Sequence, residues 1–95
     1  MSDIEERIRK YKEIEKKALE IVKISVPESS FLFTFAVDGL KMVRSYFEDA
    51  QHFSDKGDYL NAFAALNYSY GWLDAMVRLG VLDGGSNDKL FTLFK

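Results

Sequence analysis

Apolar and charged residues alternate along the first part of the chain with the three- and four-residue spacing of an amphipathic helix. Pro27 ends this pattern, because proline disfavours helical backbone angles in the residue before it. The spacing therefore predicts a helix over residues 3–24, and we interpret its Glu-, Lys- and Arg-rich side as solvated surface. The apolar stripe comprises Ile4, Ile8, Tyr11, Ile14, Ala18, Ile21 and Val22.

A second helix is predicted over residues 29–56, where apolar residues form two adjacent seams. Ser29 or Ser30 can cap its start, and Gly57 follows its end. Because two seams imply contacts on two sides, we expect this helix to touch both of its neighbours. The first seam comprises Leu32, Ala36, Leu40, Val43, Phe47 and Ala50, and the second comprises Phe35, Gly39, Met42, Tyr46 and Phe53.

A third helix is predicted over residues 59–79, with Asp58 as its N-cap and Gly80 just past its end. Only Asp74 and Arg78 carry charge inside it, so we expect it to be the most buried element. The connection at Gly57 is very short, and such a turn places the flanking helices antiparallel.

The pattern thus predicts an all-α protein: an up-and-down three-helix bundle with a short C-terminal apolar tail. A length of 95 residues fits a single domain over residues 1–95. Residues 80–95 form the loop and tail, and the pattern of residues 89–94 fits a helical turn and an extended segment equally well.

Aromatic side chains are abundant for so thin a core, with eight Phe, five Tyr and one Trp. The seams of the second and third helices can absorb about half of them. The surplus lies at the start of the second helix and in the tail, where we expect contact with a protein partner or a second copy. These residues are Phe31, Phe33, Phe91 and Phe94.

The charge balance and the absence of Cys exclude several classes of function. A net charge of −2 gives no basic surface for sequence-independent binding to nucleic acid or anionic lipid. Without Cys there are no disulfides, thiol nucleophiles or thiolate metal sites. The charged N-terminus is unlike a signal peptide, and the near-apolar stretch 31–37 is too short to span a bilayer. We therefore expect a cytoplasmic protein without nucleic-acid or membrane partners.

The one histidine, His52, lies among acidic residues, which makes this segment the nearest approach to a metal site. Glu48, His52 and Asp55 can share one helix face, with Asp58 just past the turn. Imidazole and carboxylates suit Zn, Mn or Fe, but a single helix rarely supplies enough converging ligands. We expect a surface histidine beside acids and no cofactor, with a divalent-cation site as the alternative.

Catalytic constellations are hard to build from this sequence. The only histidine would have to serve as base for Ser45, Ser54 or Ser69, and no glycine-rich phosphate loop or nucleophile-elbow motif is present. We therefore expect no enzymatic activity and no catalytic residues.

A polar strip on the third helix is a further candidate site. Asp74 and Arg78 are spaced for an ion pair along the helix, and Gly71 suggests close packing of another group. The pair can simply tether the helix to the loops, or it can line a groove beside Tyr68 and Trp72. These aromatic rings could also stack on nucleobases, although no basic patch accompanies them.

The segment from Gly57 to Gly80 is also distinctive as a whole. It contains a Gly-Asp-Tyr turn, an Ala-Phe pair and the run Tyr-x-x-Gly-Trp-Leu-Asp-Ala-x-Val-Arg-Leu-Gly. This pattern resembles an archaeal family of small helical proteins known only as domain of unknown function 357. The likeness covers essentially the whole chain, but Met76 stands where that family commonly has Gly. The resemblance implies an archaeal three-helix bundle, and it implies no activity.

Two hypotheses of function follow. The first is a non-enzymatic protein-interaction or self-association module, most simply a homodimer, which uses the surplus aromatic residues. The alternative is a small-ligand or divalent-metal-binding helical protein, which uses the acidic residues around His52 or the Asp74–Arg78 pair.

Overall fold

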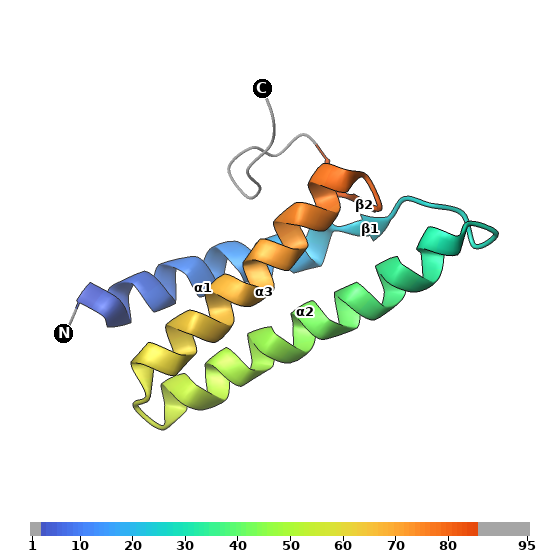
Figure 1. Ribbon diagram of the computed structural model, residues 1–95. Helices are drawn as coiled ribbons and strands as arrows, with labels where there is room; N and C mark the ends of the chain where they lie inside the picture. The colour runs from blue at the N-terminus through green and yellow to red at the C-terminus, as the bar shows by residue number, and fades with distance from the viewer. Residues whose placement is uncertain (1–2, 86–95) are drawn as a thin grey trace.

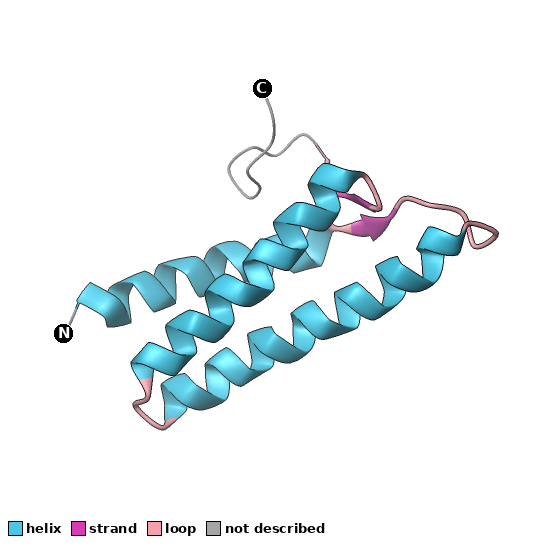
Figure 2. Cartoon of the chain, viewed as in Figure 1, coloured by secondary structure: helices cyan, strands magenta, loops and turns pink. Residues whose placement is uncertain are grey.

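The computed structural model describes residues 3–85. This part of the chain folds into three helices and a small antiparallel ribbon, as Figures 1 and 2 show. The all-α three-helix architecture is thus confirmed. The elements in chain order are α1 (Asp3–Ile21), β1 (Lys23–Ile24), α2 (Phe31–Asp55), α3 (Tyr59–Leu79) and β2 (Leu82–Asp83).

The predicted start of α3 and one of the two predicted caps of α2 agree with the structure, because a capping side chain fixes each of these helix ends. Ser30 caps α2, because its side chain accepts a hydrogen bond from the backbone N–H of Leu32 at 3.1 Å. Asp58 caps α3 by accepting one from the N–H of Asn61 at 3.3 Å. Between these helices Gly57 has a φ of +79°, which a residue with a Cβ rarely adopts. This tight turn sets α2 and α3 side by side and antiparallel (Figure 1).

The first helix is shorter than predicted, and a ribbon replaces part of the predicted loop. β1 pairs Lys23 with Asp83 and Ile24 with Leu82, and the N–H of Ser25 donates to the carbonyl oxygen of Val81 at 3.0 Å. Pro27 disfavours helical angles at Val26, so the helix of α1 does not continue through this segment. The ribbon ties the end of α1 to the end of α3 and leaves the β2 residue Leu82 buried.

α3 packs closely against both other helices, and α2 touches both of its neighbours as expected, although its contact with α1 is the weaker one. Figure 2 shows α3 between α1 and α2. α1 and α2 approach mainly through side chains, such as the hydrogen bond from the Lys12 ammonium to the side-chain oxygen of Gln51. In the second seam of α2, Phe35 and Tyr46 contact Trp72 and Tyr68 of α3.

The core consists of two buried clusters that meet at Phe47, which packs against both. In the first, Gly39 of α2 lies against Met76 of α3. A Cβ at position 39 would lie only 2.7 Å from the Met76 methyl carbon, so the glycine makes room for the methionine. The buried members of the first cluster are Ala18, Leu19, Ala36, Val43, Leu73, Met76, Val81 and Leu82, and those of the second are Ile8, Ala50, Ala62, Ala65 and Leu66.

Candidate functional site

A buried carboxyl group lies at the centre of the bundle. Glu15 of α1 is 0% exposed, and its position along the helix falls between Ile8 of one core cluster and Ala18 of the other. Its carboxylate oxygen Oε2 lies 2.6 Å from the hydroxyl of Ser69 on α3, and its other oxygen, Oε1, is buried without a hydrogen-bond partner among residues 3–85. A buried polar atom without a partner is costly, so this carboxyl is an exception that needs an explanation.

Burial raises the pKa of Glu15 from 4.5 to about 7, and the hydrogen bond from Ser69 offsets part of that effect. The nearby Tyr70 responds to the same surroundings. Its pKa is raised to about 12, first by burial and then by the negative charges of Asp74 and Glu15. Tyr70 directly follows Ser69, the hydrogen-bond partner of Glu15, and lines the cavity between α1 and α3, so both residues belong to the α1–α3 interface.

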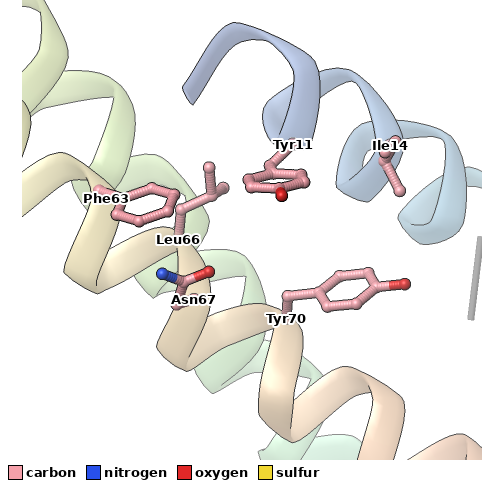
Figure 3. A pocket seen from close by; sticks show the side chains of 6 residues that line it. All are labelled: Tyr11, Ile14, Phe63, Leu66, Asn67 and Tyr70. Atoms are coloured by element: carbon pink, nitrogen blue, oxygen red, sulfur yellow. The ribbon is translucent and has the colours of Figure 1, made fainter. Parts of the chain in front are cut away.

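A cavity of about 350 Å³ opens between α1 and α3, and it is lined by Ile14 and Tyr70, the sequence neighbours of Glu15 and Ser69, but not by Glu15 itself. Figure 3 shows its side chains pointing into the space between the two helices. The rings of Tyr11 and Phe63 stack at one side with centroids 6.0 Å apart and planes inclined by 18°. Glu15 directly follows Ile14 and lies one turn after Tyr11. The lining residues are Tyr11, Ile14, Phe63, Leu66, Asn67 and Tyr70.

A second apolar surface lies on the α2–α3 hairpin. Two ring contacts cross the hairpin there: Phe35 with Trp72 at 6.3 Å between centroids, and Tyr46 with Tyr68 at 4.7 Å. The largest exposed fraction belongs to Phe31, one turn before Phe35, at 87%. We call this surface the α2–α3 face and define it by Phe31, Phe35, Tyr46, Tyr68, Trp72 and Leu79.

The four residues of the predicted polar groove on α3 do not line one common groove in the structure. Tyr68 and Trp72 line a shallow depression on the α2–α3 face, together with Asn67, Gly71 and Ala75. Asp74 and Arg78, by contrast, do not line this depression. They lie close to each other, with 3.9 Å between the Asp74 carboxylate oxygen and the Arg78 Nε atom.

Gly71 does not have the packing role predicted for it. A Cβ added at this position would meet nothing within 4 Å, and the residue is exposed on the surface of α3. The helix therefore carries a glycine there without a steric reason in the described part of the chain.

The predicted interaction phenylalanines differ in their surroundings. Phe31 is almost fully exposed, whereas Phe33 is half-buried. Phe91 and Phe94 lie outside the described residues.

The predicted cation site at Glu48, His52, Asp55 and Asp58 is not assembled. Within residues 3–85, no three such side chains come together in a group that could hold a metal ion. Two of the carboxylates have other roles: Asp55 accepts a hydrogen bond from Gln51 at 2.7 Å, and Asp58 accepts from the side chain of Asn61 at 2.7 Å while capping α3. His52 is exposed.

The sequence interpretation missed the buried pair of Glu15 and Ser69. Its charge places Glu15 on the solvated side of the predicted first helix, and the sequence alone suggests Ser69 only as a nucleophile. A positional signal was present, since Glu15 lies seven residues after Ile8 and three before Ala18, in register with the buried stripe.

Comparison with known proteins identifies one family. The sequence profile of a family described as "Protein of unknown function (DUF357)" matches residues 10–82, which include most of α1, all of α2 and α3, and the start of β2. No curated protein and no solved structure matches significantly. In the described part of the chain, none of the helices combines the length and apolar character that crossing a membrane requires.

Proposed function

Because the chain belongs to this family of proteins of unknown function, DUF357, whose description assigns no activity, we propose a function from the surface itself. We propose that the protein is a non-enzymatic self-association module and that two copies pack through their α2–α3 faces. The observation that carries this proposal is the row of exposed large apolar side chains along one side of the hairpin. Phe31 is 87% exposed, Leu79 65% and Tyr68 48%.

Exposed apolar groups in a contiguous patch favour burial against a partner, and aromatic residues are enriched in interface cores. α1 covers the other side of α3 through the cavity residues Tyr11 and Phe63, so the α2–α3 face is the side left open for a further helical layer. A second hairpin of the same kind would complete a four-helix arrangement across this face.

The occupant that we propose for the face is a second copy. A two-fold axis can set α2 of one copy against α3 of the other, so that the same apolar side chains are buried on both copies.

Sedimentation velocity with single substitutions tests this proposal. Phe31→Ser and Leu79→Ser should shift the protein toward the monomer, because each removes apolar area from the face. Leu60→Ser is the matched control, since Leu60 is 75% exposed at the opposite end of α3 and outside the face. Equal self-association in all three variants and the wild type would refute the interface.

The partners beyond a second copy, the cytoplasmic location, the archaeal origin and the lack of enzymatic activity remain predictions of the sequence. The self-association proposal depends on none of them.

A further inference from the structure

The α1–α3 cavity is a separate feature from the α2–α3 face, although Asn67 lines both this cavity and the depression on that face. We propose that this cavity binds a small organic cation, a protonated amine carried on an apolar or aromatic body, with Glu15 as the buried counter-charge. The argument rests on the walls of the cavity, on the missing partner of Glu15, and on the charges around it.

The walls suit a cation with an apolar body. Tyr11 and Phe63 at one side and Tyr70 from α3 offer aromatic rings, whose faces attract cations, and Leu66 provides apolar surface. The volume of about 350 Å³ falls at the small end of the range for ligand pockets. Asn67 also lines the cavity, and its side-chain amide is a polar group there.

The carboxyl supplies a charge that the protein itself leaves unbalanced. Glu15 has one hydrogen bond, from the neutral Ser69, and its Oε1 atom has no partner among residues 3–85. A cation in the cavity does not need to touch this group, since charges interact strongly across several ångströms of protein interior. Tyr70, which lines the cavity, directly follows Ser69, the hydrogen-bond partner of Glu15.

The other charged groups near Glu15 do not supply the missing counter-charge. On α3, the titratable neighbours are Tyr70 and, one turn further, Asp74, whose charge is negative. On α2, Arg44 and Glu48 line a separate groove with Lys16 and Glu20 of α1. Lys12 of α1 is engaged with Gln51 of α2.

Binding should therefore be linked to the ionisation of Glu15. A cation stabilises the carboxylate over the neutral carboxyl, so the amine binds best where Glu15 is ionised. With a pKa of about 7, the ionised fraction rises about tenfold between pH 6 and pH 8, and the affinity for the amine should rise by about the same factor. A neutral ligand of the same shape should show no such dependence.

An NMR titration with benzylamine and its neutral analogue benzyl alcohol tests this inference on the full chain. At pH 8, benzylamine should perturb the signals of Tyr11, Phe63 and Tyr70 and bind about tenfold more tightly than benzyl alcohol, a difference typical of one favourable charge interaction. At pH 6 this preference should largely disappear. Equal affinities for the two probes at pH 8, or perturbations located elsewhere, would overturn the proposal.

Two variants distinguish the contribution of the Glu15 charge to amine binding from that of the aromatic walls of the cavity. Glu15→Gln should remove both the amine preference and its pH dependence, while a circular dichroism spectrum checks that the helices persist. Tyr11→Leu should weaken amine binding several-fold without removing the pH dependence, because it removes one aromatic wall. Tyr46→Leu is its matched control, since Tyr46 is equally exposed at 37% but lies on the α2–α3 face. An unchanged amine preference in Glu15→Gln would exclude Glu15 as the counter-charge.

Discussion

The Ser69 hydroxyl lies 2.6 Å from Oε2 of Glu15 and 3.0 Å from the carbonyl oxygen of Leu66, in the interior where α1 meets α3. A hydroxyl has one hydrogen, so it cannot fully donate to both acceptors at once. If Glu15 is protonated, its own O–H donates to Ser69 and the Ser69 hydrogen is free for Leu66. The geometry therefore satisfies more hydrogen bonds when the carboxyl is neutral.

This relationship predicts a pH-dependent stability. The pKa of Glu15 is about 7 in the folded protein against an ordinary 4.5, so the folded state retains a proton that the unfolded state has released between those values. The free energy of unfolding should fall as pH rises from 4.5 to 7 and level off above, by up to about 3 kcal/mol. Urea unfolding at a series of pH values measures this change.

The variants Glu15→Gln and Glu13→Gln locate the origin of that change. Glu15→Gln should remove the decline above pH 4.5, because the amide does not ionise. Glu13 lies on the same helix but is exposed, so Glu13→Gln should retain the wild-type profile. A decline that persists in Glu15→Gln would assign the effect to another group.

Gly39→Ala should destabilise the protein by about 1–2 kcal/mol. The new Cβ would lie 2.7 Å from the methyl carbon of the buried Met76, and this overpacking outweighs the gain in helix propensity. In a Met76→Ala background the clash is gone, so the same substitution should become neutral or stabilising. Thermal unfolding of the four proteins of this double-mutant cycle checks the coupling, and additive effects would contradict it.

Gly71→Ala should stabilise the protein by up to about 1 kcal/mol. The position is exposed in the middle of α3, and an added Cβ meets nothing within 4 Å, so only the helix propensity changes. For a domain of this size, the expected rise in Tm is about 4–8 °C. Because Gly71 lines the depression on the α2–α3 face, the measurement is made at low concentration on the monomer, where a lowered Tm would contradict the prediction.

Asp58→Ala should cost about 1 kcal/mol, because it removes the cap whose side chain accepts from the N–H of Asn61. Asp55→Ala is its control. Asp55 lies at the C-terminal end of α2, where a negative charge opposes the helix dipole, so its loss should change stability little. Chemical unfolding of both variants distinguishes a capping role from a general effect of removing an acid, and equal losses would contradict the capping role.

Features of the fold that depend on neighbouring residues were predictable from the sequence. The ends of α3 follow from Asp58 and Gly80, which act within one turn of the chain. The β1–β2 ribbon was not predictable in this way, because it pairs Lys23 with Asp83 across two intervening helices. Each two-residue strand is also too short to leave a periodic pattern in the sequence.

The candidate sites show the same division. The exposure of Phe31 was predictable, because the chain has more large apolar side chains than a core of this size can cover. The family resemblance of residues 57–80 was also visible in the sequence, and it agrees with the family that matches. Glu15 was not predicted, because a charged residue at a core position looks like a surface residue until its partner on another helix is known. Gly39 and Gly71 likewise look similar in sequence, and only the structure shows that a Cβ at Gly39 would meet the end of the Met76 side chain whereas one at Gly71 would meet nothing.

The α2–α3 face can be tested directly through the fluorescence of Trp72, the single tryptophan of the chain and a member of that face. If two copies pack through the face, the emission maximum should shift to shorter wavelength as the protein concentration rises, and Phe31→Ser should delay this shift to higher concentration. An emission maximum that stays constant from dilute to concentrated protein and is the same in the wild type and Phe31→Ser would contradict the proposed interface.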